Sequence, residues 1–117
     1  MRPDHAAATY GYLTTKGRIS GQDHTVEIWF AEHEGTLYLL SGSGGGSDWC
    51  LNLEASPSAE FTIDGKRYPV SGRLVTDAAE DARARQAVFE KYQPVYDGDL
   101  IEWRDASAPY ALDLARA

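Results

Sequence analysis

The nine residues that decide the fold are Leu13-Thr14-Thr15-Lys16-Gly17-Arg18-Ile19-Ser20-Gly21. The run that leads into them, Tyr10 to Thr15, is rich in aromatic and β-branched residues, which is typical of a strand. Lys16 to Gly21 contains two glycines and predicts a tight connection. His24 to Ala31 then places Val26, Ile28 and Phe30 on one face, so it predicts a second strand. The stretch therefore predicts two strands joined by a turn that carries two cations.

Further strand signals lie on both sides of the middle of the chain. Glu34-Gly35 is a hairpin turn that leads into the nearly continuous apolar run Thr36 to Ser41. Asp64-Gly65 is the strongest short hairpin signal in the chain, and it joins predicted strands at Ala59 to Ile63 and Tyr68 to Val75. The alternation of Tyr110 to Leu114 predicts a last strand. We therefore expect five or six strands.

Two helices interrupt the strands. Gly42 to Gly46 suits neither a strand nor a helix, and Ser47 or Asp48 then caps a short helix that runs to about Ala55. Asp77 and Glu80 form a capping-box pattern for a second helix from Ala78 to about Tyr92, which Pro94 ends. Leu100 to Trp103 suits a short helical or extended piece. The order predicts a mainly β, antiparallel domain over residues 1–117, a small barrel or twisted sheet with a helix across it, preceded by a loose lead-in at 1–9.

Composition limits the functions open to this chain. Its 117 residues carry a net charge of −7, which argues against a nucleic-acid-binding surface, because phosphate neutralisation needs a basic face. No apolar run approaches the length of a membrane span, and a single Cys50 cannot form an internal disulfide. We therefore expect a cytoplasmic protein. His5, His24 and His33 lack metal-ligand spacing, so we expect no metal.

Two motifs resemble a known family. Leu13 to Gly21 is similar to the Leu-Thr-Thr-x-Gly-Arg-Lys-Ser-Gly signature of the deazaflavin (F420)-dependent nitroreductases, with Ile19 where that family usually has Lys. The family's Gly-rich loop and Trp-x-x-Asn-Leu helix match the segment that contains Trp49, Asn52 and Leu53, although the loop here is shorter. The resemblance covers about Tyr10 to Tyr96. It implies a split β-barrel related to the flavin-binding pyridoxamine-phosphate oxidases.

The resemblance also implies a function and a set of site residues. The family transfers a hydride from reduced F420 to quinones, nitroaromatics or other activated acceptors. F420 carries a phosphodiester and a glutamate tail, so a site for it must attract negative charge. Its expected contacts here are Lys16, Arg18, Ser20, Gly21, Ser43, Gly44, Gly45 and Trp49, with FMN as the alternative cofactor. Without the resemblance, the cations of the turn simply keep a loop soluble, the glycines form a flexible connector, and Trp49 packs in the core.

The substrate side and the partners follow in the same way. Tyr92, Tyr96 and Trp103 are candidates to line the substrate side, and aromatic core packing is the alternative for each. No Ser-His-Asp triad or carboxylate pair is evident, as expected where a cofactor carries the chemistry. A non-catalytic carrier of FMN, a fatty acid or another hydrophobic small molecule uses the same groove, and a structural domain without a ligand is the third possibility. By analogy with other split barrels, we expect a homodimer.

Overall fold

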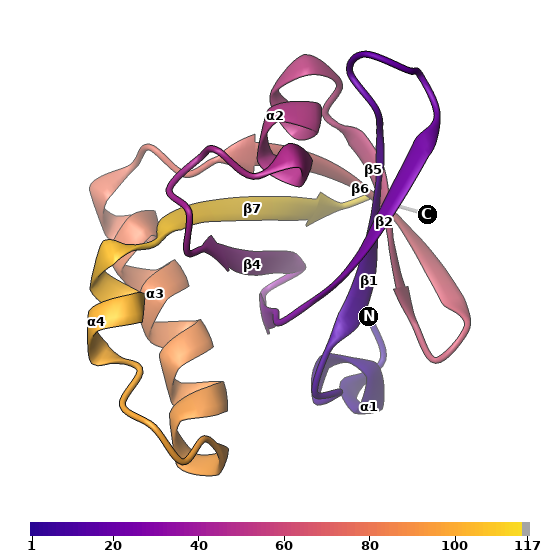
Figure 1. The fold of residues 1–117 in the computed structure, drawn as a ribbon. Helices are drawn as coiled ribbons and strands as arrows, with labels where there is room; N and C mark the ends of the chain where they lie inside the picture. The colour runs from indigo at the N-terminus through magenta and orange to yellow at the C-terminus, as the bar shows by residue number, and fades with distance from the viewer. Residues whose placement is uncertain (116–117) are drawn as a thin grey trace.

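One curled, antiparallel sheet of seven strands forms the body of the molecule (Figure 1). The computed structural model describes residues 1–115. The strands are β1 (Gly11–Lys16), β2 (Asp23–Ile28), β3 (Ala31–His33), β4 (Thr36–Ser41), β5 (Ser58–Ile63), β6 (Lys66–Leu74) and β7 (Ala108–Leu114). They pair in the order β2-β1-β5-β6-β7-β4-β3, and every pair is antiparallel. The prediction of a mainly β, antiparallel split barrel is confirmed.

The two edge strands of the curled sheet are neighbours in the chain. Trp29 and Phe30 alone separate β2 at one edge from β3 at the other. The expectation of a single strand from His24 to Ala31 is therefore wrong. The chain leaves one edge of the sheet and joins the opposite edge, so the ladder must break at the corner. Phe30 is fully buried at this corner, where its ring packs on that of Phe61.

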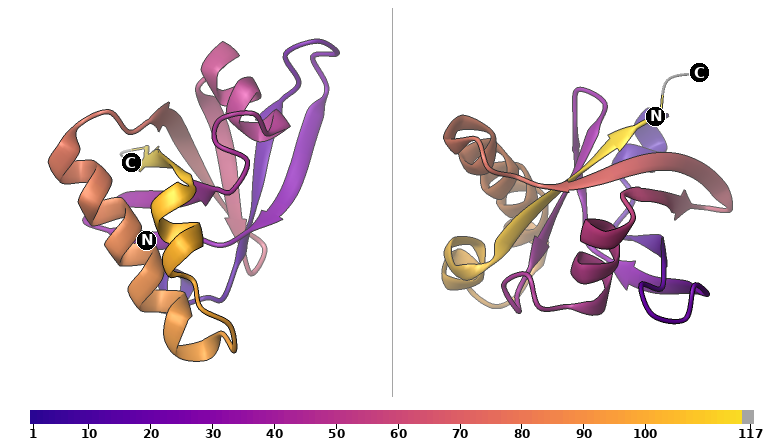
Figure 2. Two further views of the ribbon diagram at one scale, coloured as in Figure 1. Left: turned by 60° about the vertical axis from the view of Figure 1, so that its left-hand side comes forward. Right: turned by 90° about the horizontal axis from the view of Figure 1, so that it is seen from above.

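The helices cover different parts of the sheet. They are α1 (Pro3–Ala6), α2 (Asp48–Ala55), α3 (Ala78–Tyr92) and α4 (Ile101–Ala106), with a short 3-10 turn at Gln93–Val95. Figure 2 shows α3 and α4 together on one side of the sheet and α2 at the end of the barrel. The short α4 settles the helical or extended alternative left open for Leu100 to Trp103.

Helix α3 has the bounds that the sequence predicts, although half of its capping box is used differently. The Asp77 carboxylate accepts a hydrogen bond from the Glu80 backbone N–H at 2.9 Å. The Glu80 carboxylate binds Arg73 and Tyr38 instead of returning to the N-cap. The ion pair between Arg73 and Glu80 thus ties the start of α3 to β6.

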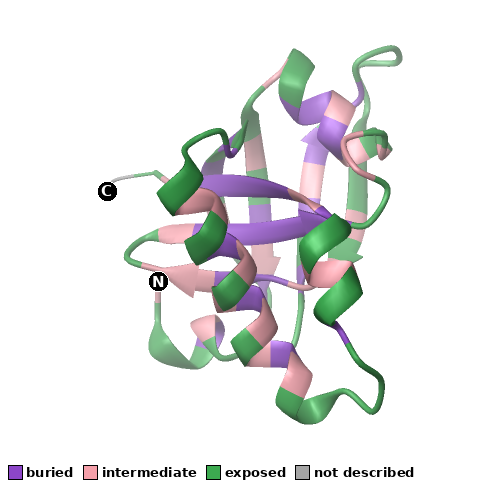
Figure 3. Cartoon of the chain, turned by 90° about the vertical axis from the view of Figure 1, so that its left-hand side faces the viewer, coloured by how far each residue is buried: buried purple, intermediate pink, exposed green. Residues whose placement is uncertain are grey.

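Two apolar clusters pack on the sheet. The first lies inside the curl and includes Leu13, Leu39, Leu53, Phe61 and Leu112. The second lies between the sheet and α3, whose buried residues Ala84, Val88 and Tyr92 face β3, β4 and β7 (Figure 3). Because the buried residues of α3 are spaced four apart, they form one stripe of the helix.

The N-terminal segment is more ordered than the loose lead-in that we expect for residues 1–9. Helix α1 lies within it, and His5 is buried with its Nδ1 2.6 Å from the Tyr68 hydroxyl. The Lys91 ammonium donates to the carbonyl oxygens of Ala6 and Phe30 at 3.2 and 2.8 Å, and burial lowers its pKa to about 8. These anchors are tertiary contacts, so the local sequence carries no sign of them. None of the helices in residues 1–115 combines the length and apolarity of a membrane span.

Candidate functional site

The cationic turn after β1 meets the first residues of α2. The Arg18 guanidinium donates from Nη1 to the Asn52 side-chain oxygen at 2.9 Å and from Nη2 to Asp48 at 3.3 Å. Ser47 and then Asp48 directly follow the triple glycine. The two segments that carry the sequence motifs therefore lie against each other, and Arg18 does not point into bulk solvent: its side chain is 31% exposed.

Asn52 is the residue that joins these segments. It is buried, and its side-chain oxygen accepts from both the backbone N–H and the guanidinium of Arg18. Its amide nitrogen donates to the hydroxyl of Thr15, which is also buried, at 3.1 Å. An asparagine suits this place because its amide presents an acceptor and a donor at the same time. Asn52 thus fixes the turn and the helix relative to each other.

A pocket of about 230 Å³ opens beside the guanidinium. Its lining residues are Gly17, Arg18, Ile19, Ser20, His24, Asp48 and Asn52. One side of the Arg18 guanidinium is held by buried Asn52, whereas its other partner, Asp48, has a side chain that is 85% exposed. Since surface ion pairs contribute little, an anionic group in the pocket can compete with Asp48 for the guanidinium. The arrangement can hold a small anion.

The start of α2 differs from one of our expectations. Ser47 is the N-cap residue, and its side chain makes no capping hydrogen bond. Asp48 lies in the first turn of the helix and pairs with Arg18, so the alternative of Asp48 as the cap is wrong. The reason is that the guanidinium, which comes from a segment 30 residues earlier, offers the carboxylate a charged partner.

The Gly-rich loop forms a compact turn lined by hydroxyl groups. Gly44 has a positive φ of 71°, and its N–H donates to the Ser41 carbonyl at 3.2 Å. The hydroxyl of Ser43 bonds that of Ser47, and both lie near the hydroxyl of Ser41. A Cβ at Gly45 would lie 3.2 Å from the Tyr110 hydroxyl. The loop therefore presents backbone and serine hydroxyl groups without bulky side chains.

The other expected cofactor contacts are distributed less uniformly. Lys16 is exposed at the end of β1 opposite Asp23, and it is not among the residues that line the Arg18 pocket. Ser20 lines that pocket, but its hydroxyl accepts from the Gln22 N–H at 3.2 Å. Gly21 supplies the left-handed φ of 73° that the turn needs. The structure thus brings Arg18 and Ser20 to one pocket and leaves Lys16 outside it.

Trp49 and Tyr92 both pack against other aromatic rings. The Trp49 ring meets Tyr110 edge to face, with centroids 5.2 Å apart, and it remains partly exposed. Tyr92 is buried and stacks on Trp29 with centroids 4.2 Å apart. Its hydroxyl lies 2.6 Å from the Thr9 carbonyl oxygen, and burial raises its pKa to about 12. Tyr92 therefore supports the site from the core.

A second pocket, of about 340 Å³, lies next to this stack. It is lined by Trp29, Tyr96, Asp99, Leu100 and Trp103. A Cβ at Gly42 would lie 3.2 Å from the indole nitrogen of Trp103, so the Gly-rich loop reaches from the aromatic pocket at one end to Asp48 and the Arg18 pocket at the other. Tyr96 and Trp103, two of the expected substrate-side residues, share this pocket.

The site residues expected from the sequence do not include His24, Trp29 or Asp99, each of which lines one of the two pockets. His24 pairs with Thr15 across the β1–β2 ladder, which places it beside the turn. Trp29 occupies the corner between the edge strands, and Asp99 lies in the connection before α4. A correct register for the first hairpin would reveal His24. The positions of Trp29 and Asp99 depend on tertiary packing.

Comparison with known proteins agrees with the motifs. A sequence model of the F420H(2)-dependent quinone reductase family matches residues 7–100. The chain belongs to this family. The expected resemblance to F420-dependent enzymes with a split barrel related to pyridoxamine-phosphate-oxidase-like proteins is confirmed.

Solved structures share the fold at low sequence identity. An F420-H2-dependent reductase superposes with a TM-score of 0.72 at 19% identity, over 90% of this chain and 94% of that one. A protein solved as a domain-swapped dimer gives 0.72 at 19% identity, over 90% and 80%. A candidate pyridoxamine 5'-phosphate oxidase from Listeria innocua gives 0.68 at 14%, over 93% and 86%. These structural similarities show that the present chain has the split-barrel fold.

Proposed function

We propose that this chain binds F420H2 and transfers a hydride from it to a quinone-like, nitroaromatic or similarly activated acceptor. The observation that carries the proposal is the contact of Arg18 with Asn52 and Asp48, which places a cation beside the Gly-rich loop on a chain of net charge −7. Local positive charge on an otherwise acidic protein favours an anionic ligand at that place. Membership of a family of F420H2-dependent reductases supports F420H2 as that ligand.

The residues near Arg18 fit an anionic end of the cofactor. Arg18 would hold a phosphate or carboxylate through its planar fork, with Ser20 and His24 at the pocket rim as further donors. The open backbone at Gly44, where an added Cβ would meet nothing within 4 Å, would allow a flat ring system to approach, flanked by Trp49. When bound, F420H2 supplies a hydride, and a quinone takes it up with one further proton to become a hydroquinone.

The substrate side of the proposal is the aromatic pocket. Tyr96 is 47% exposed at its rim, and Trp103 and Trp29 supply flat apolar surface for an acceptor ring. Tyr92 would act indirectly, because it is buried and stacks on Trp29. The chain contributes orientation and a partly dry surface, and no side chain is assigned a proton transfer.

A fluorescence titration with F420 tests the proposal. We expect F420 fluorescence to be quenched on binding. We expect Arg18→Ala to weaken binding at least about fivefold, because it removes one charge-assisted contact. Arg67→Ala is the matched control, since Arg67 is an exposed cation that pairs loosely with Glu60 at 4.0 Å, away from the Arg18 pocket. Turnover is measured as oxidation of F420H2 by a soluble quinone. If the Arg18→Ala and Arg67→Ala variants bind F420 with equal affinity, Arg18 does not hold the anionic end of the cofactor.

A non-catalytic carrier is the second candidate function. Ile19 is 90% exposed at the pocket where the family usually has Lys, which removes a cation and adds an apolar rim. This change favours a ligand with less negative charge than F420. Binding of FMN or a fatty acid without F420 binding or F420H2 oxidation would support the carrier and exclude the reductase.

A homodimer and a cytoplasmic location belong to the same proposal. The dimer rests on analogy with the related protein solved as a domain-swapped dimer. Sedimentation velocity measures it, and a monomer at working concentrations would contradict it.

A further inference from the structure

The aromatic pocket has the shape of a cage for a cation. Trp29 lies nearly perpendicular to Tyr96 and to Trp103, with interplanar angles of 82° and 87° and centroids 5.7 and 5.8 Å apart. Tyr92 covers one face of Trp29, so the opposite face and the ring edges are what the indole offers to the pocket. Aromatic rings set at right angles around a space of about 340 Å³ form the walls of a box. Ring faces carry negative potential and attract cations.

A carboxylate completes the pocket. Asp99 is among its lining residues, and the Asp99 Oδ1 accepts from the Ile101 N–H at 2.9 Å. Within residues 1–115, Asp99 takes part in no ion pair, so its charge is available to a ligand. A neutral flat acceptor has no need of this carboxylate, whereas an organic cation gains from it.

Two cations that are adjacent in sequence to aromatic residues of this region, Arg104 and Lys91, have partners of their own. The Arg104 guanidinium pairs with Asp105 at 2.8 Å and lies over the Phe89 ring at 4.6 Å. The Lys91 ammonium lies over the Phe30 ring at 3.7 Å and binds the backbone carbonyls of Ala6 and Phe30. Neither residue lines the pocket. A cationic ligand therefore does not displace a side chain that already fills the cage.

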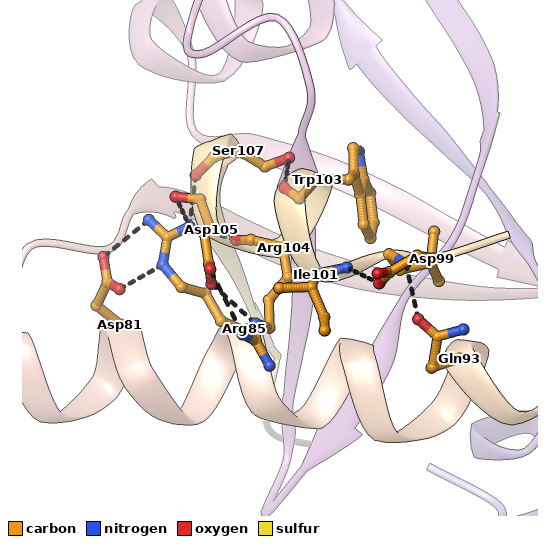
Figure 4. A network of polar contacts seen from close by, with 10 residues as sticks. Asp81, Arg85, Gln93, Asp99, Ile101, Trp103, Arg104, Asp105 and Ser107 are labelled. Carbon is orange, nitrogen blue, oxygen red and sulfur yellow. Dashed lines mark hydrogen bonds and ion pairs between the residues drawn. The ribbon is translucent and has the colours of Figure 1, made fainter.

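The segment that carries Asp99 and Trp103 is held in place from α3 and from the 3-10 turn that follows it (Figure 4). Gln93 accepts from the Leu100 N–H at 2.7 Å and donates to the Gly98 carbonyl at 2.8 Å. The Arg85 guanidinium donates to the carbonyl oxygens of Arg104 and Ser107 at 2.6 and 2.7 Å and pairs with Asp81. A cage built on anchored segments is preorganised, so binding costs little ordering of the protein.

From this geometry we infer that the pocket of Trp29, Tyr96, Trp103 and Asp99 binds the quaternary or methylated ammonium group of a small organic molecule. The inference deepens the proposed function, since on that proposal the pocket is the substrate side and the acceptor carries, or is accompanied by, a cationic group. The binding step itself requires no cofactor. Two of the three tryptophans of the chain line the cage, so their fluorescence reports occupancy.

A pair of probes that differ in charge alone tests the inference. Choline and its neutral isostere 3,3-dimethylbutan-1-ol have nearly the same shape, and each is titrated against tryptophan fluorescence at low ionic strength. We expect choline to bind about tenfold more tightly than the alcohol, because cation–π attraction and the carboxylate act on the charge alone. Equal binding of the two probes, or binding of neither, would overturn the inference.

Two substitutions separate the cage from the general acidity of the chain. Asp99→Asn retains an oxygen for the Ile101 N–H, so the start of α4 keeps its contact, and we expect choline affinity to fall about fivefold. Asp97→Asn removes the same charge from the same exposed connection outside the pocket and leaves choline affinity unchanged. An equal loss in both variants would assign the effect to the overall field and refute the cage.

The outcome is distinct from that of the F420 titration. The choline experiment contains no deazaflavin, so failure of F420 binding leaves its result intact. Trp103→Leu is expected to remove choline binding while F420 affinity at the Arg18 pocket persists. A thermal melt of each variant identifies loss of folding. If Trp103→Leu is unstable, the choline affinities of the Asp99→Asn and Asp97→Asn variants test the cage instead.

Discussion

Replacement of Asn52 by alanine provides the sharpest test of how the site is assembled. Asn52 is 2% exposed, and its side chain makes three hydrogen bonds, two to Arg18 and one to Thr15. The bond to the Arg18 backbone contributes about 1 kcal/mol, and the bond to the partly exposed guanidinium contributes a similar amount. Loss of the third bond leaves the Thr15 hydroxyl, 1% exposed, without its donor, which costs about 1–2 kcal/mol more.

We therefore expect Asn52→Ala to lower the free energy of unfolding by about 3 kcal/mol. For a domain of this size, that loss corresponds to a fall in Tm of about 12 °C. Urea unfolding followed by far-UV circular dichroism measures it. Thr15→Val serves as the partial control, since it removes the Thr15 bond alone and is expected to cost about 1 kcal/mol.

A double-mutant cycle makes the prediction refutable. Arg18→Ala in the Asn52→Ala background should cost about 1 kcal/mol less than in the wild type, because the hydrogen bond between the guanidinium and Asn52 is already lost there. Additive losses would mean that the guanidinium gains nothing from Asn52. A total loss below about 1 kcal/mol for Asn52→Ala would refute the reasoning outright.

Two further predictions concern the charged groups. The carboxylate of Glu80 receives hydrogen bonds from Arg73 and Tyr38, which lower its pKa from 4.5 to about 2. Its folded-state pKa is lowered, so its contribution is present above about pH 4.5 and is lost as the pH falls toward 2. Since the Arg73 side chain is 42% exposed, we expect Glu80→Gln to cost about 1–2 kcal/mol at pH 7 and almost nothing at pH 2, measured by urea unfolding; a cost that does not change with pH would contradict this. Asp48→Asn removes the carboxylate that competes for Arg18, and we expect F420 affinity to rise about threefold at low salt and less at high salt, by fluorescence titration; unchanged affinity would place the anion elsewhere.

Local signals predict the elements with strong boundaries. Asp77 and Pro94 bracket α3, and the helix has the expected bounds because capping and the loss of a backbone donor act within a few residues. The break at Trp29 and Phe30 escapes prediction, since the alternation of apolar residues continues through it. What breaks the strand is the closure of the barrel, which is a property of the whole sheet.

The sequence also predicts part of the candidate site and misses the rest. The motifs indicate that the Arg18 turn and the Gly-rich loop with Trp49 belong to one site. In the structure, Arg18 reaches the helix after that loop through hydrogen bonds to Asn52, 34 positions away. Lys16, the last residue of β1, stays outside the Arg18 pocket. It alternates with buried Thr15, which contacts Asn52, so its side chain lies on the opposite face of the strand. The aromatic cage depends on two segments, one with Trp29 and one from Tyr96 to Trp103, that meet only in the folded chain, and no local pattern of Trp29 or Asp99 indicates it.

The position of the Arg18 pocket depends on a packing contact in the core. A Cβ at Gly72 in β6 would lie 2.6 Å from a methyl carbon of Leu53, so the bare glycine is what lets α2 approach the sheet. Leu53 is adjacent to Asn52, and with Leu53 seated in the barrel core, Asn52 faces the end of β1 and the Arg18 turn. The depth at which Leu53 packs in the barrel therefore sets how close the start of α2 comes to the Arg18 guanidinium. Packing inside the fold and electrostatics at its surface are two consequences of the same helix position.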